Sequence, residues 1–184
     1  MKKSFIKNLA TCFGLGDMPK APGTFGTLGG IPIYIGMLFL RKVFPNHMLY
    51  NSFYFMFLMT FFVVAVYVSD IAEREIYHKK DPQNVVIDEV LGYLTTLFLI
   101  NPVGWFQAFV AMGLAFVIFR LFDITKPGPI YKSQFLGHGV GVVIDDFLAG
   151  IIGNFDIYIL QIIVHFLWVV KENEPKETRP AGEK

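Results

Sequence analysis

Four long stretches of this 184-residue chain carry almost no charge, and this feature limits the possible folds more than any other. They are residues 21–40, 48–69, 90–119 and 147–170. About 20 consecutive apolar residues are enough to cross a hydrocarbon core about 30 Å thick. The sequence therefore predicts an all-α fold, a polytopic membrane helical bundle with about four transmembrane or re-entrant helical segments.

The composition agrees with lipid as the solvent. Apolar residues make up 54% of the chain and charged residues only 17%, against about 25% charged in an ordinary soluble domain. The net charge is +1 and the basic residues form no stripe, so we expect no nucleic-acid partner. The single cysteine, Cys12, excludes an intrachain disulfide and a multi-cysteine zinc site.

The length is that of one domain. We interpret residues 1–170 as a single membrane-embedded domain and residues 171–184 as a polar, disordered tail, and the sequence leaves the oligomeric state open. The N-terminus has no apolar run of signal-peptide length, so we do not expect it to be cleaved.

The four stretches differ in regularity. Residues 48–69 read as a transmembrane helix, whereas 21–40 opens with glycines and prolines, so a firm helix is expected only from about Thr27. The turn signature Asn-Pro-Val-Gly at 101–104 divides residues 90–119 into a helical hairpin. Its first arm, of about twelve residues, is too short to cross comfortably, so it either spans or re-enters the membrane.

The lysines predict the topology. Lys2, Lys3, Lys7 and Lys20 favour a cytoplasmic N-terminal segment by the positive-inside tendency. Two spans and a hairpin then return the chain to the same side, and every acidic cluster faces the cytoplasm. Residues 41–42, Arg-Lys, fall on the outer side, against the same tendency.

Three groups of acidic residues flank the apolar stretches. They are Asp88 with Glu89, Asp123 with Lys126, and Asp145 with Asp146. Carboxylates are the ligands that Mg²⁺ prefers, and unpaired charge among apolar residues is costly. A divalent-cation site is therefore favoured over the alternative of solvated helix ends.

Adjacent carboxylates on a helix diverge by about 100°. Only one member of each pair is therefore expected to face a shared ion, unless the pair lies at a frayed helix end. On this basis we expect Asp88 and either Asp145 or Asp146 to be the primary ligands.

Cationic and polar residues near these groups could bind phosphate. Arg120, Asp123 and Lys126 are three apart and share one face if the helix continues that far. On that face the two cations could bind phosphate oxygens, or the three residues could form an ion-pair ladder.

The segment GLGDMPKAPGTFGTLGG offers Lys20, Thr24, Thr27 and backbone amides for phosphate, or is simply a re-entrant loop. It contains no Walker A motif. His138, in LGHGVG, could relay a proton or bind phosphate, or be an ordinary loop residue.

Five blocks, taken in order, resemble the phosphatidylglycerophosphatase A family. They are PGTFGTLGG at 22–30, SD at 69–70, IDE at 87–89, FRLFDITKPGPI at 119–130 and GHGVGVVIDDFLAG at 137–150. The resemblance implies a Mg²⁺-dependent enzyme of the bacterial cytoplasmic (inner) membrane. Such an enzyme removes the terminal phosphate of phosphatidylglycerophosphate to give phosphatidylglycerol.

The resemblance also implies a set of functional residues. The catalytic set is Asp88, Glu89, Asp123, Lys126, Asp145 and Asp146. Within it, Asp88, Glu89, Asp145 and Asp146 are the expected metal ligands, and the 22–30 loop is expected to contact phosphate.

Two other classes of protein also keep acids near a membrane. A lipid phosphotransferase would carry DGxxAR followed by GxxxDxxxD, which this sequence lacks. A transporter would place its acids in mid-span, whereas only Asp156 lies well inside an apolar stretch. Neither class accounts for Lys126 and Pro127 beside Asp123.

Overall fold

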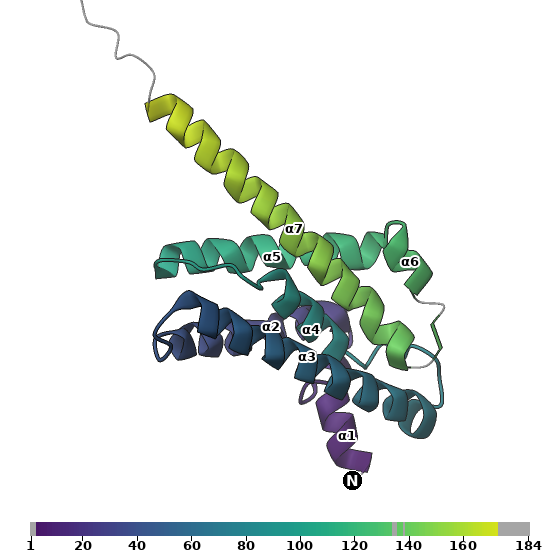
Figure 1. Cartoon of the computed structure of the whole chain (residues 1–184). Coiled ribbons are helices and arrows are strands. Elements are labelled where there is room, and N and C mark those ends of the chain that lie inside the picture. Colours follow the sequence, from purple (N-terminus) through teal and green to yellow (C-terminus); the bar gives the residue numbers. More distant parts are fainter. Residues whose placement is uncertain (1–2, 134–135, 138, 173–184) are drawn as a thin grey trace, which may run out of the picture.

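A computed structural model describes residues 3–133, 136–137 and 139–172, and every regular element within these ranges is a helix (Figure 1). In chain order the elements are α1 (Lys3–Ala10), η1 (Leu15–Asp17), α2 (Pro22–Arg41), α3 (His47–Ile71), η2 (Ala72–Tyr77), α4 (Ile87–Thr96), α5 (Trp105–Thr125), α6 (Pro129–Ser133) and α7 (Gly139–Glu172). The predicted all-α fold is confirmed.

Four helices are long and apolar enough to cross a membrane: α2, α3 continued by η2, α5, and α7 as far as Leu167. Their outward side chains are apolar; Met56, Val117 and Phe166, for example, are 67%, 64% and 64% exposed. Apolar surface on this scale is a site of contact with another apolar phase. The chain is a membrane protein with several candidate spans, as predicted.

Two helices begin earlier than the apolar pattern indicates. Helix α2 starts at Pro22 rather than near Thr27, because proline is accepted in the first turn, where its missing N–H would have no helical partner. Helix α7 starts at Gly139, ahead of the apolar stretch at 147–170. Asp145 and Asp146 therefore lie within a regular helix.

Residues 97–104 separate α4 from α5, which confirms the predicted break. Helix α4 has ten residues and is about 15 Å long, half the thickness of a hydrocarbon core. Nine of these ten residues are buried, and α4 packs against α7, α2 and α3 near the centre of the bundle (Figure 1). The first arm of the hairpin is thus a half-length helix enclosed by longer ones.

The carbonyl groups at the end of α4 and in the connection after it receive side-chain hydrogen bonds from other helices. The bonds run from Tyr54 Oη to Leu94 O (2.9 Å), Asn154 Nδ2 to Thr96 O (3.0 Å), Tyr158 Oη to Leu99 O (3.2 Å), Tyr34 Oη to Ile100 O (3.3 Å) and Arg41 Nη1 to Pro102 O (3.1 Å). Irregular backbone at membrane depth is tolerated only where its polar groups are satisfied in this way.

Two glycines bring the backbones of α4 and α7 into direct contact. A Cβ atom on Gly150 would lie 2.4 Å from Gly92 O, and one on Gly92 would lie 2.7 Å from Asp146 O. Small residues at such crossings allow membrane helices to approach closely. The contact holds the Asp146 segment of α7 beside the first turns of α4.

We predict that Tyr54→Phe lowers the stability of the protein in detergent by about 1 kcal/mol, because Leu94 O would lose the buried side-chain donor and keep only the weaker bond from Leu97 N (3.2 Å). The hydroxyl of Tyr67 offers a matched control, since this residue is on the same helix but 54% exposed. Thermal unfolding should show a lower midpoint for Tyr54→Phe and an unchanged one for Tyr67→Phe. Equal midpoints for both variants would contradict the role given to Tyr54.

Candidate active site

A cavity of about 540 Å³ lies where the beginnings of α2, α4 and α7 meet the end of α5. The loop between η2 and α4 closes one side of it. Its lining residues are Pro19, Ala21, Pro22, Gly23, Asp81, Gln83, Val85, Asp88, Glu89, Arg120, Asp123, Ile124, Lys126, Val142, Asp145 and Asp146. All three acidic groups singled out in the sequence therefore share one cavity.

Three carboxylates form a tight cluster in this cavity. Asp88, Glu89 and Asp146 each offer an oxygen, and these oxygens lie within 4.8 Å of one another. Asp88 and Asp146 are only 5% and 4% exposed. Glu89 is partly exposed as a residue, but its Oε2 atom is buried and has no hydrogen-bond partner in the described part of the chain.

The first turn of α4 places two of these carboxylates. Asp88 and Glu89 are its acidic residues, and the positive end of a helix dipole favours anions there. The start of α4 is tied to the N-terminal segment, because Val86 N donates to Ala10 O (2.9 Å). On the far side, a Cβ atom on Gly23 would lie 2.5 Å from Glu89 Oε1, so a larger residue at this point of α2 would displace the Glu89 carboxylate.

The expectation that only one member of each adjacent pair faces a shared site describes the α7 pair, and the α4 pair falls under its exception for a helix end. On α7, Asp146 joins the cluster while Asp145 pairs with Lys126. On α4, both Asp88 and Glu89 reach the cluster. The difference arises because the α4 pair lies at the very start of its helix, where the side chains are not confined by a preceding turn.

The two cations of the cavity are each held by an acid. Arg120 forms an ion pair with Asp123, three residues further along α5. Lys126 donates to Asp145. It does not continue the helix face of Arg120 and Asp123, because α5 ends at Thr125 and Lys126 has left-handed backbone angles (φ 42°). The expected three-residue face on a continuous helix is therefore wrong, although all three side chains line the cavity.

The balance of charge in the cavity is strongly acidic. Six carboxyl groups line it, against the guanidinium of Arg120 and the ammonium of Lys126. Burying carboxylates without compensation is expensive, so protons or cations must offset the excess. A phosphate group would add further negative charge, so it could enter only if protons or cations also offset that charge.

Of the described residues predicted to bind substrate, three do not line the cavity. Lys20 is exposed and Thr24 half-buried, and neither lines the cavity. The hydroxyl of Thr27 is buried and donates to Gly23 O (2.8 Å) within α2, so its hydrogen bond is made inside the helix and not to the cavity. His138 lies outside the described residues. The glycine-rich segment contributes Pro19, Ala21, Pro22 and Gly23 instead.

Asp81 and Gln83 line the cavity but were not selected from the sequence. They belong to a loop that returns to the bundle because Asp81 N donates to the buried carboxylate of Glu73 (2.7 Å), with Asp81 in a left-handed conformation (φ 50°). No local spacing in the sequence signals this contact. The sequence indicates only that Asp81 and Gln83 are polar residues shortly before the buried start of α4.

The two carboxyl groups at the start of α4, which lies outside the four candidate spans, bind protons more tightly than exposed carboxyls do. Burial raises the pKa of Asp88 well above its ordinary value, and the neighbouring charge of Glu89 raises it further. Burial also raises the pKa of Glu89 to about 8. Both groups therefore hold protons at a pH where exposed carboxyls are ionised.

Together, the bundle and its acidic cavity define a polytopic membrane protein with a polar reaction site at the ends of its helices. The family model described as phosphatidylglycerophosphatase A matches residues 8–161. The chain belongs to this family, and it is accordingly an enzyme of the phosphoric monoester hydrolase class. The resemblance noted in the sequence blocks is confirmed.

Three relatives show how far the similarity extends. A Bacteroides thetaiotaomicron protein named "Putative phosphatidylinositol-3-phosphatase" is 33% identical over 92% of this chain and 98% of its own length. The phosphatidylglycerophosphatase A of Escherichia coli is 33% identical over 83% of this chain and 81% of its own. That of Haemophilus influenzae is 32% identical over 85% and 88%. No solved structure matches the chain.

The raised pKa of Glu89 predicts that the metal-free protein loses stability as pH rises. The native state holds a proton that the unfolded state releases near the ordinary value of 4.5, so the stabilisation is complete below that pH and is lost toward about 8. Thermal unfolding in detergent with a chelator should show this fall, and Glu89→Gln should reduce it. A midpoint that is flat between these pH values would contradict the prediction.

Proposed function

We propose that this protein hydrolyses the terminal phosphomonoester of phosphatidylglycerophosphate, giving phosphatidylglycerol and phosphate, in bacterial phospholipid biosynthesis with Mg²⁺ as cofactor. The single observation that carries the proposal is the cavity in which three clustered carboxylates lie beside Arg120 and Lys126. Family membership supports the reaction class, and the names of the Escherichia coli and Haemophilus influenzae relatives support the substrate.

The residues present fit a divalent cation. Three oxygens within 4.8 Å of one another suit the all-oxygen shell of Mg²⁺, and the buried Glu89 Oε2 lacks a partner. Asp88, Glu89 and Asp146 would hold the ion, while Asp145 pairs with Lys126. Bound there, Mg²⁺ supplies charge stabilisation for a phosphoryl group and lowers the pKa of a bound water.

The chain's own cations would bind and orient the phosphoryl group. Arg120 and Lys126 face the same cavity from the end of α5, and each can donate to phosphate oxygens as it now donates to a carboxylate. Asp123 and Asp145 keep these two side chains in place before substrate binds. In the reaction, a water oxygen bonds to phosphorus, the bond from phosphorus to the glycerol oxygen breaks, and a proton from water reaches that oxygen.

A second phosphomonoester lipid should be assayed beside phosphatidylglycerophosphate. The Bacteroides thetaiotaomicron relative covers more of this chain than the other two relatives, and its name refers to a phosphatidylinositol 3-phosphate substrate. The reaction would be the same and only the headgroup would differ. Asp81 and Gln83 are the polar groups of the cavity available to contact headgroup hydroxyls.

We predict that Asp146→Asn and Glu89→Gln each lower kcat on the order of 100-fold or more, because each removes a carboxylate that would hold the cation beside the reacting phosphate. The measurement is phosphate release by purified protein from micelles of phosphatidylglycerophosphate, with phosphatidylinositol 3-phosphate in parallel. Wild-type activity should require Mg²⁺ and be lost with a chelator.

Glu75→Gln is the matched control. Glu75 lies outside the cavity and the family blocks, where it pairs with Lys3 (3.6 Å), and its variant should keep near wild-type activity. Full activity of Asp146→Asn would overturn the site assignment. Wild-type activity in chelator would overturn the metal, and faster release from the inositol lipid would overturn the headgroup.

We further propose that the protein lies in the bacterial cytoplasmic (inner) membrane with the cavity facing the cytoplasm. Arg74, near the cavity end, and Val103, which is 91% exposed on the 97–104 connection, should then react from opposite sides. In a Cys12→Ser background, an impermeant maleimide should label Val103→Cys in intact spheroplasts. It should label Arg74→Cys only after lysis. Labelling in the reverse pattern would invert the topology.

A further inference from the structure

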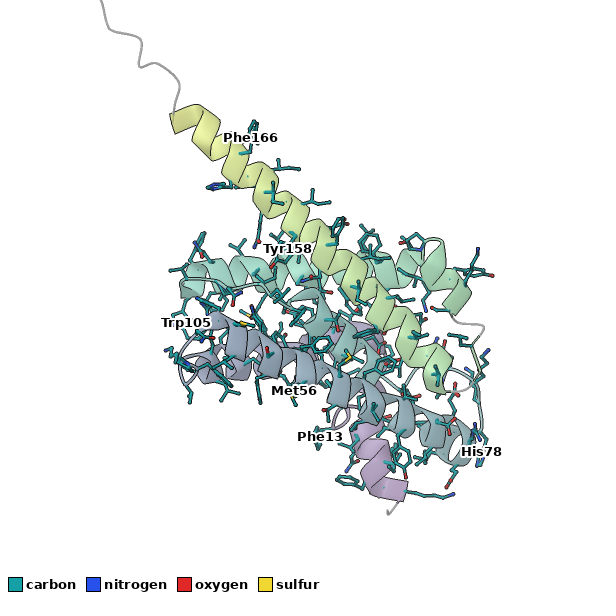
Figure 2. All side chains as sticks on the ribbon, viewed as in Figure 1. Phe13, Met56, His78, Trp105, Tyr158 and Phe166 are labelled. Atoms are coloured by element: carbon teal, nitrogen blue, oxygen red, sulfur yellow. The ribbon has the colours of Figure 1, made fainter. Side chains whose placement is uncertain are left out.

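A second cavity lies at the other end of the bundle, far from the acidic cluster. Its volume is about 540 Å³, and it is formed by the end of α2, the start of α3 and the start of α5. Helix α5 carries Trp105 at one end and the catalytic cavity at the other, and its 21 residues make it about 30 Å long. Figure 2 shows Trp105 and His78 at opposite ends of the bundle. Substrate chemistry in the first cavity therefore has no direct contact with this one.

Cations without acidic partners mark this second cavity. The cations Arg41 and Lys42 line it together with the imidazole of His47, and no Asp or Glu is among the lining residues. In the described part of the chain, neither Arg41 nor Lys42 forms an ion pair with a carboxylate. Both also lie on the side that the positive-inside tendency disfavours in the proposed topology.

The Arg41 guanidinium is held in a fixed orientation. Its Nη1 donates to Pro102 O (3.1 Å), and its Nη2 lies 3.2 Å from His47 Nδ1. Lys42 is exposed, and its ammonium lies 5.2 Å from the centre of the Phe39 ring. A fixed guanidinium with an exposed ammonium beside it is suited to phosphate oxygens.

The rest of the cavity wall is apolar. Phe39 and Trp105 pack with ring centres 5.4 Å apart, and Leu38 and Ala108 lie beside them. Tryptophan is enriched where a membrane meets water, at the depth of lipid headgroups. The cavity thus combines a cationic rim with an aromatic and aliphatic wall, the two surfaces that a phospholipid headgroup and its first acyl carbons require.

We propose that this cavity binds an anionic glycerophospholipid from the leaflet opposite the catalytic cavity. Arg41 and Lys42 hold the lipid phosphate, and the Phe39–Trp105 wall contacts the glycerol and upper acyl chain. Free phosphate would leave that wall uncovered, and a zwitterionic lipid has no net negative charge to offset Arg41 and Lys42. The bound lipid stabilises the 97–104 connection, because Arg41 contacts both the lipid and Pro102 O.

The test is the thermal midpoint of purified protein in detergent with added phosphatidylserine. This lipid is anionic, and its phosphate is a diester that the proposed hydrolase reaction would not cleave. Wild-type protein should gain roughly 5 °C from phosphatidylserine and little from phosphatidylcholine or inorganic phosphate. The double variant Arg41→Gln, Lys42→Gln should lose the gain. Native mass spectrometry should show one fewer retained phosphatidylserine on that variant.

The double variant Lys79→Gln, Lys80→Gln is the charge-matched control, since both lysines are exposed and lie near the catalytic end. It should keep the gain, and so should Asp146→Asn, whose change lies in the other cavity. If the Arg41 variant does not fold, Lys42→Gln alone should halve the gain or more. An equal gain in the Lys42→Gln variant, or from phosphatidylcholine or inorganic phosphate, overturns the proposal.

Discussion

Side chains of the longer helices hydrogen-bond to the carbonyl groups at the end of α4 and in the connection after it, and these bonds allow a short helix to end inside the bundle. A helix of half the membrane thickness leaves its last carbonyls deep in the bundle, where no water can satisfy them. Tyr54, Asn154, Tyr158 and Tyr34 supply donors from three longer helices. Because the helix can end there, its start can lie at the cavity with Asp88 and Glu89 in the first turn.

The site and the fold make opposite demands on the same residues. Six carboxyl groups around one cavity weaken the folded state wherever they are ionised and uncompensated. Arg120 and Lys126 offset part of this charge through their ion pairs with Asp123 and Asp145. Of the other four carboxyl groups, Asp81 lies on the loop before α4, and Asp88, Glu89 and Asp146 form the cluster where the proposed cation would bind.

Periodicity and charge placement predicted much of this arrangement, because membrane spans and acidic boundaries are local features. The helical class, the candidate spans, the break at 101–104 and the meeting of the acidic groups all follow from them. The departure of Lys126 from the α5 face depends on its left-handed backbone, and the inward turn of Asp81 depends on Glu73, eight residues earlier. Contacts of this kind arise from tertiary packing, which a single sequence does not display.

Because Arg120 and Lys126 are already paired with carboxylates, phosphate binding would exchange one anionic partner for another. Under the proposed function, an incoming phosphoryl group replaces Asp123 and Asp145 as the partner of two cations that are already in place. Little side-chain entropy is then lost on binding, because those side chains are ordered beforehand. When the product phosphate departs, the two carboxylates take back their cations. Asp123 and Asp145 thus compete with the product phosphate for the two cations, which favours release of the product.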